Sequence, residues 1–265
     1  MALVFIAFCP SSPLLVPSIG KEHSKRLSPT ISSLEGLAQE LYSAKPDVLL
    51  TISTQTKSLG GSYIIDIAEN YQPDLSEFGD FSNKSKFKPS LSLISMIGEE
   101  AEDHHIPIQS NSQSKLDYNT AIPLWFLTKL LPKLMLIPLH TTDLNMKINY
   151  NFGRLLYNIG HQTDKRVAVI ATGSLSQTLA ESSPAGYNES GVTLVKKIRA
   201  MIRQNKLANL LKIDPQLPKT AISNGFDPLI VLAGLLSNYH YQSVSPVFQE
   251  IFGTGLLTAN FTFDR

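Results

Sequence analysis

The chain has 265 residues, of which 43% are hydrophobic and 17% are charged, and its formal net charge is +1. This composition is typical of a soluble globular protein that is long enough to bury a large core. The near-neutral charge and the dispersed basic residues argue against a general nucleic-acid binder.

The first predicted element is a buried strand at the apolar N-terminus. Met1–Phe8 carries no basic leader, and three prolines follow between positions 10 and 17, which favours a strand over a signal peptide. No run approaches the roughly 18 to 20 apolar residues that a membrane span needs, so we expect a cytoplasmic protein without a membrane partner. The single cysteine, Cys9, excludes an intramolecular disulfide, and no Cys/His cluster indicates structural zinc.

Apolar strands and amphipathic helices then alternate along the chain. Helix signals begin at Ser28, where a serine precedes a proline, and the pattern runs towards Pro46. A polar segment without periodicity predicts a long surface loop at 71–88. Strands are predicted at 47–53, 62–68, 134–139, 167–171, 242–248 and 255–263, and further helices at 91–102, 121–130, 150–159, 191–211 and 228–237.

This alternation predicts an α/β fold, a three-layer α/β/α sandwich around a mixed, mostly parallel sheet. The last two strands resemble a hairpin and would add the antiparallel part. The longest helix, 191–211, should bury Val192, Val195, Ile198 and Ile202. We find no repeat or linker, so residues 1–265 are expected to form a single domain.

Polar residues follow the strand at 167–171, where ligands of α/β proteins usually bind. Ser174 and Gln177 stand at this strand end, yet neither is a strong acid, base or metal ligand. The same mismatch recurs at other strand ends, so the chain has the pattern of an enzyme from which the chemistry has been removed.

Several short motifs occur in a characteristic order. They are Pro13-Leu14-Leu15-Val16-Pro17, Lys45-Pro46-Asp47, Leu116-Asp117 followed by Pro123-Leu124-Trp125-Phe126-Leu127, Gly173-Ser174-Leu175-Ser176 and Phe252-Gly253-Thr254-Gly255. In order and spacing the chain resembles the LigB-like superfamily of class III extradiol ring-cleavage dioxygenases, which includes the Memo-like and AmmeMemoRadiSam-system proteins. The resemblance covers nearly the whole chain.

The resemblance implies where a metal would be held. Active members bind Fe(II) through two histidines and a glutamate and leave open positions for a catechol and O₂. In this chain Ser11 occupies the place of the first histidine and Gln55 that of the second. The glutamate place falls at Ser223 or Asn224, just before Gly225. Each expected ligand is therefore a neutral side chain.

The resemblance also implies two other replacements. Where active members carry an acid/base histidine, this chain has Gln177, and where they carry another pocket histidine, it has Tyr118. We interpret the chain as a non-catalytic member that needs no cofactor. It would keep a polar pocket lined by Ser11, Gln55, Tyr118, Gln177 and Ser223, with Asp117, His140, Ser174 and Asn224 nearby. A small molecule, a peptide or a protein could bind there. The sequence is also compatible with an oligomer.

The alternative is an active extradiol-type dioxygenase that holds Fe(II) through substitute ligands. Cys9, Asp117 and His140 are the candidates, since each lies near a strand end or a former pocket loop. A lone histidine at a strand end is more often structural, and a lone cysteine more often a small buried apolar residue. These residue types therefore favour the non-catalytic interpretation.

Overall fold

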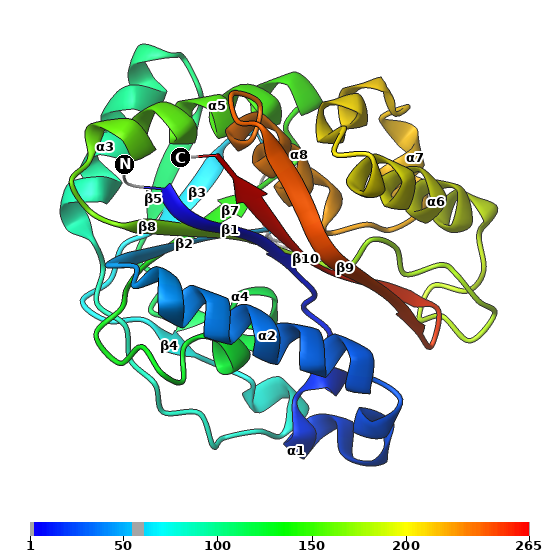
Figure 1. Ribbon diagram of the computed structural model, residues 1–265. Helices are drawn as coiled ribbons and strands as arrows, with labels where there is room; N and C mark the ends of the chain where they lie inside the picture. The colour runs from blue at the N-terminus through cyan, green and yellow to red at the C-terminus, as the bar shows by residue number, and fades with distance from the viewer. Residues whose placement is uncertain (1–2, 55–60, 265) are drawn as a thin grey trace.

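The computed structural model describes residues 3–54 and 61–264, and within them eight strands form one sheet in the order β5-β3-β7-β2-β8-β1-β10-β9 (Figure 1). A second small sheet pairs β4 with β6. The strands are β1 (Leu3–Cys9), β2 (Val48–Thr54), β3 (Tyr63–Asp66), β4 (Gln72–Pro73), β5 (Ile108–Asn111), β6 (Lys115–Leu116), β7 (Met135–Thr141), β8 (Val167–Thr172), β9 (Tyr241–Ile251) and β10 (Thr254–Phe263).

The centre of the large sheet is parallel, and an antiparallel pair joins it to each margin; at one margin, β5 is parallel to β3. Strands β7, β2, β8 and β1 run in one direction. Strand β3 is antiparallel to β7, and β10 is antiparallel to both β1 and β9. The mixed, mostly parallel sheet predicted from the sequence is therefore confirmed, including the closing hairpin.

Helices cover both faces of the sheet, with α2 and α4 on one side and α3, α5, α6 and α8 on the other (Figure 1). The helices are α1 (Pro17–Gly20), α2 (Ser28–Ala44), α3 (Leu91–Asp103), α4 (Tyr118–Leu127), α5 (Met146–Gln162), α6 (Glu189–Arg203), α7 (Gln216–Thr220) and α8 (Phe226–Leu235). No helix in the described part of the chain combines the length and apolar character that a membrane span requires.

The sheet has a hydrophobic core on each of its two faces, and the alternation of side chains along each strand explains why. Because successive side chains of a strand point to opposite faces, Phe5 belongs to the cluster that contains Leu34 of α2, whereas its neighbour Ile6 belongs to the cluster that contains Phe152 of α5 and Leu232 of α8. Strands buried on both faces need apolar residues at every position, and β1 is buried throughout. The predicted three-layer sandwich is confirmed.

Helices α5 and α8 approach each other so closely that their contact requires glycine. A Cβ atom on Gly234 would lie 1.9 Å from the backbone oxygen of Tyr150, and a Cβ atom on Gly153 would lie 2.0 Å from that of Val231. Neither distance is sterically allowed. These two glycines therefore fix the relative position of the helices that flank the cavity described below.

Helix α6 differs from its prediction in length and in its buried face. It ends at Arg203 instead of position 211, because Asn205 adopts a left-handed conformation with φ of 54°. Its buried apolar side chains include Leu194, whereas Val192 is 43% exposed. The Asn188 side chain caps the helix and so sets its rotation, which apolar spacing alone did not reveal.

The segment at 71–88, predicted as a long surface loop, contains little regular structure but is anchored to the fold. Tyr71 and Phe87 pair through backbone hydrogen bonds in both directions, and both side chains are buried. Leu75, which lies between these two residues in the sequence, is also buried. The Tyr71 hydroxyl donates to the backbone oxygen of Asp66. Three separated apolar residues thus anchor a segment that lacks periodicity.

Candidate functional site

The carboxyl ends of the parallel strands lie at one edge of the sheet, and the segments after them converge there. The turn after β8 passes close to the start of α8 because Gly173 has φ of 147° and its Cα faces Gly225; a Cβ atom on Gly173 would lie 2.5 Å from the Gly225 Cα. Only glycine combines this conformation with this approach. The β8 end therefore meets the residues that precede α8.

Asn119 is the hub of a hydrogen-bond network at this edge. Its Oδ1 accepts from Ser11 Oγ at 2.9 Å and from Asn224 Nδ2 at 3.1 Å. Its Nδ2 lies 3.5 Å from the backbone oxygen of Thr54, at the end of β2. Ser11 and Asn119 are 1% and 2% exposed. The side chain of Asn119 thus connects the loop after β1, the end of β2 and the segment that precedes α8.

Asn224 extends this network to β8. Its Oδ1 accepts from the backbone N–H of Ser174 at 2.6 Å, and its backbone oxygen accepts from Thr54 Oγ1 at 2.7 Å. Ser223 Oγ donates to the backbone oxygen of Ser174 at 3.1 Å. Neutral side chains therefore find hydrogen-bond partners at the places that the resemblance assigned to the first histidine, Ser11, and to the glutamate, Ser223 or Asn224.

The structure brings some of the predicted pocket residues together and separates others. Ser11, Ser174, Ser223 and Asn224 belong to the network just described, and Gln55 lies outside the described residues. Tyr118 packs edge-on against Phe78 with ring centroids 5.5 Å apart, and burial, reinforced by the charge of Asp117, raises its pKa. Gln177 is half-buried, and its backbone N–H donates to Ala221.

The sequence did not identify Asn119 as a site residue, because the motif Leu116-Asp117 pointed to the neighbouring residue, Tyr118. Asp117 caps α4, where its side chain accepts from the backbone N–H of Thr120 at 3.2 Å. Successive residues of the first turn then point about 100° apart, so Asn119 faces the network and Tyr118 faces Phe78. The available signal was the pair Asn119-Thr120, two polar residues at the start of an apolar helix.

His140 lies in a separate buried chain of hydrogen bonds. Its Nδ1 lies 2.8 Å from Ser53 Oγ, and its Nε2 lies 2.9 Å from Asp66 Oδ2. Asp66 Oδ1 accepts from Asn111 Nδ2 at 3.0 Å. Ser53 and His140 are 0% and 3% exposed, so a solute has no access to this serine–histidine–aspartate chain. It connects β2, β7, β3 and β5.

The residues at the sheet edge do not fit an Fe(II) centre. Both ring nitrogens of His140 have hydrogen-bond partners, and Asp117 caps a helix. Cys9 is fully buried, and burial raises the pKa of its thiol far above the usual range, which opposes the thiolate form that binds metals. In residues 3–54 and 61–264, no three side chains of His, Cys, Asp or Glu are grouped to hold a metal.

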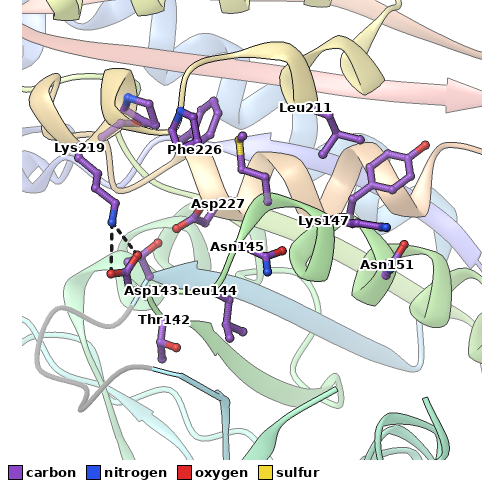
Figure 2. Close-up of a pocket in the computed structure, with 16 residues that line it drawn as sticks. Thr142, Asp143, Leu144, Asn145, Lys147, Asn151, Leu211, Lys219, Phe226 and Asp227 are labelled. Atoms are coloured by element: carbon purple, nitrogen blue, oxygen red, sulfur yellow. Dashed lines mark hydrogen bonds and ion pairs between the residues drawn. The ribbon is translucent and has the colours of Figure 1, made fainter. Parts of the chain in front are cut away.

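A cavity of about 1040 Å³ opens beside the network (Figure 2). Thr54 and Ser223 line the end nearest the network, and the start of α5, helix α7 and the start of α8 supply the other walls. Three charged residues gather on one side: Lys219 Nζ lies 3.1 Å from Asp143 Oδ1, with Asp227 beside them. Of the four predicted pocket residues that the structure describes, Ser11, Tyr118, Gln177 and Ser223, only Ser223 lines this cavity.

Asp227 is half-buried in the wall of this cavity. Burial and, to a smaller extent, the negative charge of Asp143 raise the pKa of Asp227, whereas Lys219 and the Asn149 side chain lower it, and the net result is a pKa of about 7. Burial and the nearby Asp227 also raise the pKa of Tyr63, whose hydroxyl donates to Asn149 Oδ1 at 2.6 Å. The carboxyl group thus changes charge near neutral pH. The sequence feature that could have identified Asp227 is an acidic residue at the start of a buried helix.

Comparisons with known proteins agree with the fold. The protein is 24% identical over 268 residues to "Protein CA_C1420" of Clostridium acetobutylicum; the match covers 96% of this chain and 56% of that protein. The chain therefore spans about half the length of this curated relative. A crystal structure of the uncharacterized protein JW3007 from Escherichia coli K12 superposes with a TM-score of 0.60 at 12% identity, over 86% of this chain and 91% of that one.

A family comparison covers nearly the whole chain. The family described as "Catalytic LigB subunit of aromatic ring-opening dioxygenase" matches residues 5–259. This range includes every strand of the large sheet in whole or in part, the hydrogen-bond network and the Asp227 cavity. The protein therefore belongs to the LigB family.

Proposed function

We propose that this protein is a non-catalytic member of the LigB family that retains a ligand-binding cavity. The observation that carries the proposal is the Asn119 hub, which accepts hydrogen bonds from Ser11 and Asn224. Ser11 stands where the family resemblance expects a histidine, and Asn224 is, with Ser223, one of the two residues at the place of the glutamate. A self-satisfied network of neutral groups takes the place of a metal centre.

The chemistry of these groups supports the proposal. Serine hydroxyls and asparagine amides are weak ligands for Fe(II), which prefers imidazole nitrogen and carboxylate oxygen in a facial triad. Glutamine at position 177 cannot exchange a proton at neutral pH, so it cannot act as the acid/base that the family histidine supplies. Two requirements of extradiol cleavage are missing from one site.

The dioxygenase alternative requires substitute ligands that meet at one point. Cys9, Asp117 and His140 each have a separate structural environment: a buried strand, a helix cap and a buried ion pair. None of the described residues supplies a replacement triad. The arrangement therefore supports binding rather than ring cleavage.

A small molecule is the favoured class of ligand. The cavity of about 1040 Å³ is large enough for one, because small-molecule pockets typically occupy roughly 300 to 1,000 Å³. Its polar groups converge on one side, which is typical of a site that orients a ligand. A peptide or protein partner would need a broader contact surface than this cavity provides.

The test is anaerobic titration of the protein with Fe(II), followed by elemental analysis and an oxygen-uptake assay with catechol. We expect no bound iron, no ring-cleavage product and no rise in the unfolding midpoint; a metal at about 100 times its Kd would stabilise the fold by about 2.7 kcal/mol. The triple variant Ser11→His, Gln55→His, Asn224→Glu is the matched control that should gain iron. One iron per wild-type chain with product formation would overturn the proposal.

A further inference from the structure

The charges on one side of the cavity are unequally compensated. The Lys219 ammonium lies 3.1 Å from Asp143 Oδ1 and 3.3 Å from Asp143 Oδ2, so both oxygens of that carboxylate share it. Within the described residues, no lysine, arginine or histidine forms an ion pair with Asp227. Lys147 also lines the cavity, on the side away from Asp143 and Lys219 (Figure 2). Of the two carboxyl groups on this side, Asp227 therefore has no ion-pair partner of its own, and it interacts with Lys219 only at a longer distance.

This lack of an ion-pair partner has an energetic consequence. Burying a carboxylate without a counter-charge is unfavourable, and a second carboxylate nearby adds repulsion. The raised pKa of Asp227 has these two causes in that order. A ligand that brings a positive charge into the cavity would remove both penalties at once.

We propose that this cavity binds a small organic cation, with a primary ammonium or guanidinium group on the Asp227 carboxylate and an apolar body along the cavity wall. The proposal rests on the cavity and its charges. It holds or fails independently of whether the sheet edge is catalytic.

The apolar wall defines the rest of the ligand. Phe226 and Pro218 are buried around the charged side, and the partly exposed Leu211 continues this surface. Leu144 and Met146 line the cavity from the start of α5, and methionine adapts its shape to different partners. An apolar group of a few carbon atoms attached to the cation would displace water from these side chains.

Other ligand classes fit the same walls less well. Mg²⁺ and Ca²⁺ take six or more oxygen ligands, and here one of the two carboxylates is already paired with Lys219. An anion would meet the Asp227 carboxylate, while the lysine on that side is engaged by Asp143. The charge distribution therefore selects an organic cation.

Three probes with the same apolar body separate the contributions of charge and burial. They are 2-phenylethylamine, 2-phenylethanol and 3-phenylpropionate, each titrated calorimetrically into the full chain at pH 7.5. We expect binding of the amine and no comparable binding of the alcohol or the carboxylate. Equal binding of the alcohol or the carboxylate, or no binding of the amine at millimolar concentration, would overturn the proposal.

Two variants should change amine affinity in opposite directions. Asp227→Asn removes the carboxylate with little change in shape, and we expect amine binding at least about tenfold weaker, since hydrogen bonds to charged groups contribute about 1.5–3 kcal/mol. Lys219→Met releases the Asp143 carboxylate and should strengthen amine binding. Asp164→Asn, an exposed aspartate that does not line the cavity, is the matched control and should leave affinity unchanged. Unchanged amine affinity in Asp227→Asn would refute the assignment.

Proton release gives a readout that a structural role for Asp227 would not produce. Amine binding should ionise Asp227, so affinity should rise between about pH 5.5 and pH 8, and titrations in two buffers of different ionisation enthalpy should show protons released. The other ionisable groups around Asp227 are Asp143, Lys219 and Tyr63, with Tyr150 and Lys147 on α5. The absence of proton release in wild type at pH 6.5 would contradict the proposal.

Discussion

The substitution Asp227→Asn should stabilise the folded protein, and the gain should depend on pH. The pKa of Asp227 is raised from 3.8 to about 7. Because one pH unit corresponds to about 1.4 kcal/mol, ionising this carboxyl in the folded state costs at most about 4 kcal/mol. Solvent at the half-buried carboxyl reduces this cost, so we expect a gain of about 2–4 kcal/mol above pH 7.

The sign follows from proton binding. Between pH 3.8 and about 7 the folded wild type holds the Asp227 proton more tightly than the unfolded chain does, so wild-type stability falls as pH rises through this window. Asparagine does not titrate. The free energy of unfolding of the variant minus that of wild type should therefore be near zero at pH 4 and reach its full value by about pH 8.

Urea unfolding followed by the fluorescence of Trp125, the single tryptophan, and by circular dichroism measures this difference at each pH. Taking the difference between the two proteins removes the contributions of the other titrating groups that the substitution leaves unchanged. A variant no more stable than wild type at pH 8, or a difference that does not change with pH, would refute the reasoning.

Three further substitutions test the contacts that hold the site. His140→Ala should lower the free energy of unfolding by about 3–5 kcal/mol in urea titrations, because Asp66 would be left as a buried charge without its partner; a loss below about 1 kcal/mol would contradict this role. Asn119→Ala should cost about 2–4 kcal/mol by the same method, since the buried Ser11 hydroxyl and the half-buried Asn224 amide lose their acceptor; a cost no greater than that of Ser11→Ala would show that Asn119 is not the hub. Gly234→Ala should lower the thermal midpoint, because its Cβ would lie 1.9 Å from the Tyr150 oxygen, and overpacking typically costs about 1–3 kcal/mol; an unchanged midpoint would mean that α5 and α8 separate easily.

The fold was predictable because its signals are local. The run Val167–Thr172 is apolar at every position but the last, as expected of a strand buried on both faces, and Gly173 follows it; the structure places β8 there. The motifs of the family added the order of the elements. Where prediction failed, as at Val192, the missing information was the rotation of a helix, which its cap and its packing determine.

The candidate site was less predictable because it depends on directions and distances between segments. Asn119 and Tyr118 are adjacent in sequence, yet the cap at Asp117 turns one towards the network and the other towards Phe78. Asp227 acquires its unusual pKa from α8 packing and from Asp143, which is 84 residues earlier in the chain. No local pattern reports such a pairing.

The proposed non-catalytic role agrees with the distribution of charge around the cavity. Histidines and a glutamate that converge at a sheet edge need a metal to balance them, whereas Ser11, Asn119 and Asn224 are neutral and satisfy one another. The nearby buried charge, Asp66, has His140 as its partner. Asp227 is different, since its surroundings supply repulsion from Asp143 and no ion pair among the described residues. The uncompensated charge of this part of the protein thus lies in the cavity, where a ligand can reach it.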